Sequence, residues 1–208
     1  HAIAQNNLGA MYENGHGVDV NYENAAEWYE KAAEQGDAIA QNNLGVMYEN
    51  GHGVDVNYEK AIKWYEKAAE QGLADAQYNL GVMYYRGHGV DVNYKKAAEW
   101  YEKAAEQGDA QAQCNLGAMY LQGDGVDVNF RKAFEWCEKA AEQGHAKAQF
   151  VLGALYENGQ GVDQSDSMAM RWYAKAAAQG NETAQARIHA VLAMRRASSS
   201  AAAAESSP

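Results

Sequence analysis

Three histidines stand in identical Gly-His-Gly settings, and their regular spacing could serve metal binding. His16, His52 and His88 lie 36 residues apart, and neutral imidazoles are common metal ligands. However, adjacent units of a helical array stack about 10 Å apart, whereas the ligands of one zinc ion lie about 2 Å from the metal. Asp124 and Gln160 take the same position later in the chain, and such residues tolerate a positive φ beside glycine. We therefore interpret the histidines as turn residues and expect neither a metal nor a cofactor.

Residues 55–66 resemble a calcium-binding loop only at the two ends of the segment. Asp55 and Asn57, with Glu66 at the twelfth position, match the outer ligands of an EF-hand loop. The sixth position is Lys60, where that loop needs glycine, and residues 57–71 have a helical pattern. Calcium binding is therefore not expected.

Nothing in the sequence marks a catalytic centre. The chain has no nucleophile elbow, no phosphate-binding glycine loop and no unique Ser/His/Asp set. Acidic residues recur instead at i,i+4 spacing from lysines, which is typical of a solvated helix face. These pairs are Glu27 with Lys31, Glu99 with Lys103, and Glu135 with Lys139. We do not expect an enzyme.

Composition excludes several classes of partner. No apolar run approaches the roughly 18 residues of a membrane span, so membrane insertion is not expected. The net charge of −11 disfavours nucleic acid, because phosphate binding needs clustered Lys and Arg. The two cysteines match neither a disulfide framework nor a zinc signature, which leaves cytoplasm, periplasm and secretion all open. Cys137 stands where other units have tyrosine, so we expect a buried, inert thiol there.

A 36-residue repeat sets the position of all these residues. Leucines followed by glycine recur without slippage at Leu8, Leu44, Leu80, Leu116 and Leu152. Residues 2–37 and 38–73 differ at only five of 36 positions, which indicates recent duplication or deliberate design. Such a period predicts one elongated array of stacked units.

Each unit predicts two helices. In the second unit the first helix ends at Gly51, a typical C′ residue, and the second begins at the N-cap Asn57. The core face of the first helix follows helical spacing and consists of Ala40, Leu44, Met47 and Tyr48. That of the second consists of Ala61, Tyr65, Ala68 and Ala69. No interior proline or alternating pattern competes, so the expected fold is all-α.

Gly45 lies inside the first helix of its unit, and glycine recurs at this position in every unit. Glycine in a helix costs about 0.5–1 kcal/mol relative to alanine. We therefore expect a compensating close approach of the second helix, with Ala61 and Ala68 as its small partners. Tyr48, Trp64 and Tyr65 are expected to fill the space around them.

These residues resemble a known family. The run of Ala-x-Ala, Leu-Gly, Tyr, Gly-x-Gly-Val, Lys-Ala, Trp-Tyr, Lys-Ala-Ala and Gly is similar to the Sel1-like repeat, a relative of the tetratricopeptide repeat. The resemblance covers residues 1 to about 186. The family usually has Asp where this chain has the N-caps Asn21, Asn57, Asn93, Asn129 and Ser165. Disulfide-rich members pair cysteines within each repeat, a pattern that this sequence lacks.

The resemblance implies a right-handed α/α superhelical solenoid of 36-residue helix-turn-helix repeats. It also implies an adaptor role in protein complexes, often in bacterial signalling or host contact. We expect residues 1–196 to form five repeats and a C-terminal capping helix, and residues 197–208 to form a flexible tail. The first helix of the array leaves Met11 and the edge of Tyr12 bare, so we expect either further repeats before His1 or end-to-end self-association.

Positions that vary between units concentrate on the side of the first helix opposite Leu44, which the family geometry places in a concave groove. The candidate binding residues there are Asn42, Asn43, Tyr78, Asn79, Tyr85, Cys114, Asn115, Leu121 and Phe150. The tyrosines, Cys114, Leu121 and Phe150 are expected to form a contiguous exposed patch, since aromatic anchors in a polar rim are typical of binding hot spots. The asparagines could hold a peptide backbone. Neutral drift on a solvated face is the alternative.

The leading hypothesis is a non-enzymatic module that binds a peptide or protein segment in this groove. One alternative is recognition of a small molecule or cell-wall component, with weak hydrolysis as suggested for some relatives. The other is an engineered repeat scaffold, which the near-identity of the first two units favours.

Overall fold

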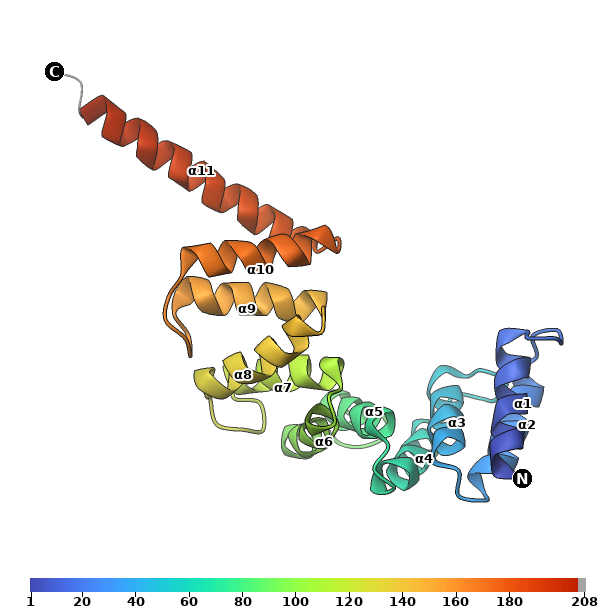
Figure 1. The fold of residues 1–208 in the computed structure, drawn as a ribbon. Coiled ribbons are helices and arrows are strands. Elements are labelled where there is room, and N and C mark those ends of the chain that lie inside the picture. Colours follow the sequence, from blue (N-terminus) through green and yellow to red (C-terminus); the bar gives the residue numbers. More distant parts are fainter. Residues whose placement is uncertain (206–208) are drawn as a thin grey trace. The chain divides into compact units, whose positions relative to one another are not determined.

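The computed structural model describes residues 1–205, with side chains for residues 1–194, and this part of the chain is entirely helical (Figure 1). Its eleven helices are α1 (Ala2–Asn14), α2 (Tyr22–Ala33), α3 (Ala38–Asn50), α4 (Tyr58–Glu70), α5 (Ala74–Arg86), α6 (Tyr94–Glu106), α7 (Ala110–Gln122), α8 (Phe130–Glu142), α9 (Ala146–Asn158), α10 (Asp166–Ala178) and α11 (Glu182–Glu205). The predicted all-α solenoid of two-helix repeats is confirmed.

The helices belong to two compact units. Unit 1 consists of His1–Ala112 with Asp124–Val126 and contains α1 to α6, while unit 2 consists of Gln113–Gly123 and the described residues from Asp127 onward. In unit 1 each helix from α1 to α6 packs on the next one along the chain. In unit 2 the same holds from α8 to α11. Packing that runs mainly between sequence neighbours in this way is typical of a solenoid.

Side-chain caps begin the second helix of every repeat, as predicted. The Asn57 side chain accepts a hydrogen bond from the backbone N–H of Lys60 at 2.9 Å. Equivalent caps begin α2, α6, α8 and α10 at Asn21, Asn93, Asn129 and Ser165. A cap of this kind pairs an N–H group that the helix itself cannot satisfy. Gly51 ends α3 in the left-handed conformation, with φ of 73°.

The Gly-His-Gly histidines are turn residues, but not for the predicted reason. Among the described residues, only glycines have a positive φ, so the histidines themselves do not adopt this conformation. His52 instead stacks on Tyr22 with ring centroids 5.0 Å apart, and His88 stacks on Tyr58 at 4.8 Å. Each loop thus docks on the start of the preceding repeat's second helix.

The core faces follow the predicted spacing. On α3 the side chains of Ala40, Leu44 and Met47 are at most 1% exposed. On α4 the buried residues include Ala61, Tyr65, Ala68 and Ala69. The alanines let neighbouring helices approach closely, while the leucine, methionine and tyrosine fill the remaining volume.

The close approach to Gly45 is made by the ring of Tyr65 rather than by Ala61 and Ala68. The sequence predicts only that this ring fills space around the two alanines, and that part of the expectation is corrected. A Cβ at Gly45 would lie 2.6 Å from Cε1 of Tyr65 and 2.7 Å from its Cδ1, closer than carbon atoms can pack. The same relation joins Gly9 to Tyr29 and Gly153 to Tyr173. The helical glycine therefore makes room for a buried aromatic ring.

One lysine of each second helix lies over a tryptophan ring, and Lys31, Lys103 and Lys139 take this contact in place of the predicted pairing with glutamate at i,i+4. Lys103 Nζ lies 3.8 Å from the centroid of Trp100, and Lys31 lies 4.3 Å from that of Trp28. Such cation–π contacts keep the ammonium group partly solvated and cover the ring with the lysine stem. Within residues 1–194 the helix-surface ion pair at i,i+4 spacing joins Arg131 to Glu135.

The ends of the chain differ from its middle. Met11 is 40% exposed, whereas Met47 at the same repeat position is 0% exposed, and the predicted partner for this end stays a prediction. α11 packs on α10. The predicted flexible tail, 197–208, lies beyond the residues whose side chains are described, and 206–208 lie outside the described residues altogether.

No described helix combines the length and apolar character needed to cross a membrane.

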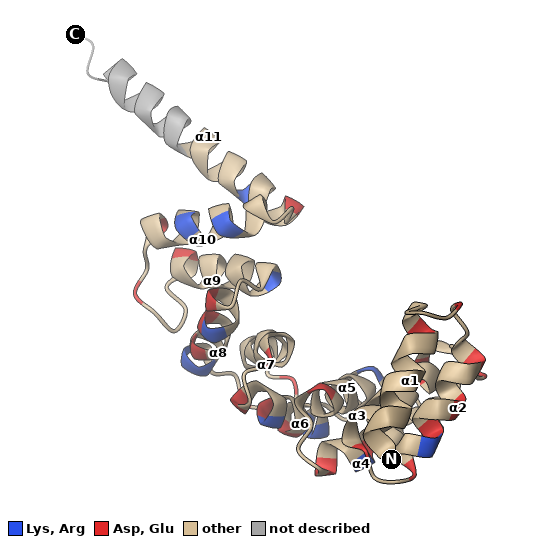
Figure 2. Ribbon diagram, turned by 45° about the vertical axis from the view of Figure 1, so that its right-hand side comes forward, with Lys and Arg blue, Asp and Glu red and all other residues tan. Residues whose placement is uncertain are grey.

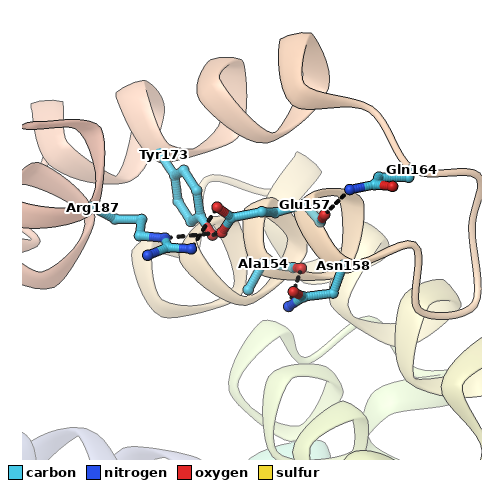
Figure 3. Close-up of polar contacts among 6 residues, drawn as sticks. All are labelled: Ala154, Glu157, Asn158, Gln164, Tyr173 and Arg187. Carbon is cyan, nitrogen blue, oxygen red and sulfur yellow. Dashed lines mark hydrogen bonds and ion pairs between the residues drawn. The ribbon is translucent and has the colours of Figure 1, made fainter. Parts of the chain in front are cut away.

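An ion pair ties α11 to α9 (Figure 3). Arg187 donates from Nε to Glu157 Oε2 at 3.0 Å and from its terminal nitrogen to Oε1 at 2.6 Å. The hydrogen bond from Arg187, aided by one from Tyr173, lowers the pKa of Glu157 below its usual value, against the opposing effect of burial. The C-terminal helix is thus held by charge as well as by packing.

We predict that Gly45→Ala destabilises the protein although alanine favours helix. The added methyl group must displace the buried Tyr65 ring, which costs about 1–3 kcal/mol against a gain of about 1 kcal/mol in helix propensity. Urea titration followed by circular dichroism measures the net loss. Gln111→Ala, at an exposed site on α7, serves as the control for propensity. A Gly45→Ala protein as stable as the parent would show that the ring does not require the glycine.

We also predict that Glu157→Gln has an effect on stability that depends on pH. Because the folded-state pKa of Glu157 is lowered, its contribution is fully present above the ordinary carboxyl pKa of about 4.3 and is lost as the pH falls through the lower folded value. At pH 7 the substitution should cost about 1 kcal/mol or less, since the pair is partly exposed. The difference should close in acid, once the pH lies below the folded-state pKa of Glu157. Glu102→Gln, exposed on α6, should show no comparable change, and a Glu157→Gln effect that persists in acid contradicts the assignment.

Candidate functional site

The candidate groove residues all lie on the first helices of their repeats. In unit 1 they are Asn42 and Asn43 on α3, and Tyr78, Asn79 and Tyr85 on α5. In unit 2 they are Cys114, Asn115 and Leu121 on α7, and Phe150 on α9.

The exposed patch expected at these positions is not continuous. Cys114 is 1% exposed and Asn42 is 8% exposed, so neither residue offers a surface. Tyr78, Tyr85 and the other candidates are half-buried. The reason is visible on α3, which packs against α2 on one flank and α4 on the other. Only a narrow strip of a first helix therefore remains accessible, narrower than a helical wheel suggests.

The aromatic candidates are anchored on other rings. The Tyr78 ring lies 5.8 Å from that of Tyr101, in a tilted arrangement. Phe150 lies 5.5 Å from Tyr173 in the same way. Tyr85 contacts Tyr94 at 5.1 Å, and its hydroxyl lies 3.3 Å from Asp124 Oδ2. Such contacts restrict the rotamers of these side chains, so their outer faces are held in place before any ligand arrives.

The asparagines bind one another across adjacent repeats. Asn79 Nδ2 donates to Asn42 Oδ1 at 3.0 Å, and Asn43 Nδ2 donates to Asn6 Oδ1 at 3.3 Å. An amide group has two donor hydrogens and an oxygen with two lone pairs. The half-buried Asn79 therefore keeps capacity for a ligand, whereas Asn43 has less, because it also reaches the Tyr29 hydroxyl.

A glutamate–tyrosine pair on the same face was missed by the sequence analysis. The Tyr29 hydroxyl donates to Glu13 Oε2 at 2.6 Å, and Tyr65 donates to Glu49 Oε2 at 2.7 Å. The fifth repeat repeats the bond, from Tyr173 to Glu157 at 2.7 Å. Burial, aided by the neighbouring carboxylate, raises the pKa of all three tyrosines, so each hydroxyl stays protonated and remains a donor.

The sequence does carry a signal for these pairs. Glutamate and tyrosine stand 16 residues apart in three repeats, and both change in the fourth, where Leu121 and Cys137 take their places. In the third repeat Tyr85 replaces the glutamate while Tyr101 remains. A side chain that changes together with another 16 residues away indicates contact between the two helices.

Arg187 completes the pair in the fifth repeat. Its guanidinium grips both oxygens of Glu157 while Tyr173 donates to Oε2 of the same carboxylate (Figure 3). Bidentate pairing of this kind is a geometry that arginine achieves and lysine does not. The carboxylate is thus oriented by one helix and bound by another.

The thiols of unit 2 are not placed to react. Cys137 is 0% exposed, as predicted, and burial raises its pKa to about 12. Burial likewise raises the pKa of Cys114. A protonated thiol is neither a nucleophile nor a metal ligand. Within residues 1–194 no three His, Cys, Asp or Glu side chains come together in the manner of a metal site.

Comparison with known proteins places this architecture in a family. The Sel1 repeat pattern matches residues 2–37, 38–73, 74–109, 110–145 and 146–181. A Sel1 repeat protein from Oxalobacter formigenes is 42% identical, with a TM-score of 0.84 over 90% of this chain and 75% of its own. The protective antigen c5321 of uropathogenic Escherichia coli, which displays the same fold, is also 42% identical, with a TM-score of 0.87.

The match to c5321 covers 90% of this chain but only 40% of c5321 itself. The immunity protein Pa5087 from Pseudomonas aeruginosa is 25% identical, with a TM-score of 0.56 over 88% of this chain and 67% of its own. No curated protein matches. Five consecutive family matches and two solved structures at 42% identity lead to one conclusion: this chain belongs to the Sel1 repeat family.

Proposed function

We propose that the chain is a non-enzymatic module that binds a protein or peptide segment along the accessible strip of its first helices. The Sel1 repeat solenoid is a fold typical of protein–protein interaction modules, and the family is generally a non-enzymatic scaffold. The finer assignment, to this strip, is our own inference.

One observation carries the proposal. Some core positions keep the same residue in every repeat, as at Leu44 and its equivalents, whereas residues on the strip change between acidic, aromatic and aliphatic. The position of Tyr85 is Glu in three repeats and Leu in another. Half-buried rings at such positions, anchored from beneath, offer apolar contact area at low entropy cost. Uncommitted amide and carboxylate groups beside them supply hydrogen-bonding capacity for a polypeptide.

Selection from a random dodecapeptide library on the immobilised chain tests the proposal. We predict that selected peptides lose at least tenfold in affinity for Tyr85→Ala, which removes a hot-spot ring worth at least about 1.4 kcal/mol. Fluorescence anisotropy of labelled peptides gives the dissociation constants. Tyr85 is chosen because Tyr78 and Phe150 pack on the core tyrosines Tyr101 and Tyr173, so truncating them would also lower stability.

Tyr58→Ala is the matched control. Tyr58 is an exposed tyrosine at the start of α4 that also makes a ring contact, with His88, and its loss should leave affinity unchanged. Circular dichroism establishes that both variants are folded at the assay temperature. Selected peptides that bind Tyr85→Ala as well as the parent, or a library that yields no binder, would reject the proposal.

A further inference from the structure

In the fifth repeat, the carboxylate of Glu157 binds an arginine side chain. Glu157 is held from one side by the Tyr173 hydroxyl and gripped from the other by the guanidinium of Arg187 (Figure 3). Arg187 lies on α11, in the helix that follows the repeat. The chain therefore contains its own example of an arginine bound at this position.

The first two repeats contain the same carboxylate without the arginine. Glu13 and Glu49 stand at the repeat position of Glu157, and tyrosines hold both through Oε2. At the repeat position of Arg187 they face the shorter side chains of Asn43 and Asn79. Asn43 reaches the Tyr29 hydroxyl but carries no charge, so it cannot neutralise the carboxylate.

The second oxygen of each carboxylate remains available. Among the described residues, Oε1 of Glu13 and Oε1 of Glu49 accept no hydrogen bond, whereas Oε1 of Glu157 accepts one from Arg187. Both glutamates are half-buried, and neither oxygen is a fully buried, unsatisfied atom. Each Oε1 is thus open to a ligand, on a carboxylate whose other oxygen is already fixed.

The two helices that carry these glutamates have no basic side chain. α1 and α3 have no Lys or Arg, and Lys31 is the single basic residue on α1, α2 and α3 (Figure 2). The charges of α4, which packs on α3, balance, with three lysines and three glutamates. The chain as a whole has a net charge of −11. A cationic partner is therefore favoured by the long-range field as well as by the site.

We propose that Glu13 and Glu49 are sockets for two arginine side chains of a partner segment, each bound as Glu157 binds Arg187. The inference rests on the proposed function and specifies its partner as a basic polypeptide. Arginine is preferred to lysine because its planar fork can engage both carboxylate oxygens. The tyrosine hydroxyl orients the carboxylate in advance, which reduces the entropy cost of binding.

The spacing of the two sockets constrains the partner. Asn43 on α3 donates to Asn6 on α1, so these equivalent helices lie side by side, and helices in contact have axes about 8–10 Å apart. A polyproline II segment has three residues per turn and rises about 3.1 Å per residue, so two arginines three residues apart lie on one face of it, about 9 Å from each other. Such a pair matches two sockets one repeat apart. An Arg-x-x-Arg motif is the expected recognition element.

A designed peptide tests the inference directly. The probe is a fluorescein-labelled Gly-Ser-Arg-Ala-Ala-Arg-Ser-Gly peptide, and the comparators replace both arginines with lysine or with citrulline, a neutral analogue of similar shape. We expect anisotropy to show binding of the arginine peptide at least tenfold tighter than of the citrulline peptide, with the lysine peptide in between. Absence of binding at millimolar protein, or equal binding of arginine and citrulline peptides, would overturn the inference.

Two double variants assign the binding to the sockets. Glu13→Gln with Glu49→Gln should weaken the arginine peptide at least tenfold, whereas Glu23→Gln with Glu59→Gln removes the same charge from exposed sites of α2 and α4 and should change affinity less than threefold. Equal losses in the two variants would mean that net charge alone attracts the peptide, and the sockets would be rejected.

A third variant fills the sockets without removing them. Asn43→Arg with Asn79→Arg copies the fifth repeat, so each new guanidinium should pair with Glu13 or Glu49 and exclude the peptide. The variant gives up the hydrogen bonds from Asn43 to Asn6 and from Asn79 to Asn42, so circular dichroism must first establish that it is folded. A variant that still binds the arginine peptide as the parent does would contradict the inference.

The library selection separates this inference from the proposed function. If the affinity of the selected peptides depends on Tyr85 but not on Glu13 and Glu49, the two arginine sockets are rejected while the proposed function is retained.

Discussion

The contact between a helical glycine and a buried tyrosine ring is the constraint on which the rest of the repeat depends. Because Gly45 has no side chain, the Tyr65 ring lies directly on the backbone of α3. This position brings the Tyr65 hydroxyl through the helix pair to Glu49 on the accessible face. One packing requirement thus fixes both the approach of the two helices and the orientation of a surface carboxylate.

Amide side chains connect one repeat to the next. Gln41 is 4% exposed, and its Nε2 donates to the carbonyl oxygen of Ala33 at 3.1 Å while its Oε1 accepts from Gln71 at 2.7 Å. In unit 2, Gln149 makes the same two bonds, to Ala141 and from Gln179. A buried amide satisfied at both ends costs little and disfavours any other register between helices.

Local rules explain which parts of the fold were predictable. Caps such as Asn57, the glycine C-termini and the core faces follow from residues within one or two turns of each other, so sequence alone identified them. The partner of Gly45 was not predictable, because whether a backbone meets Ala61 or the Tyr65 ring depends on tertiary packing. The predicted exposure of Cys114 was wrong for a similar reason. A helical wheel treats each helix as if it had one neighbour, whereas this helix is covered on more than one side.

The candidate site was predictable only in outline. The varying positions do lie on the first helices, but Glu49 was not connected with Tyr65, because the two are 16 residues apart and belong to different helices. Arg187 was noted only as one of a few positive charges near the end of the array. Its role depends on a specific bidentate geometry, which composition and periodicity do not encode.

The fourth repeat shows how such a surface can diversify. Leu121 and Cys137 replace the whole glutamate–tyrosine pair, and removing a donor and its acceptor together is far less costly than orphaning one of them. The third repeat carries a single change, with Tyr85 in place of the glutamate and Tyr101 retained, and there the new side chain packs on Tyr94 and bonds to Asp124. The surface of a repeat can therefore become apolar in one step or in two, while the helical glycine keeps the backbone of the repeat unchanged.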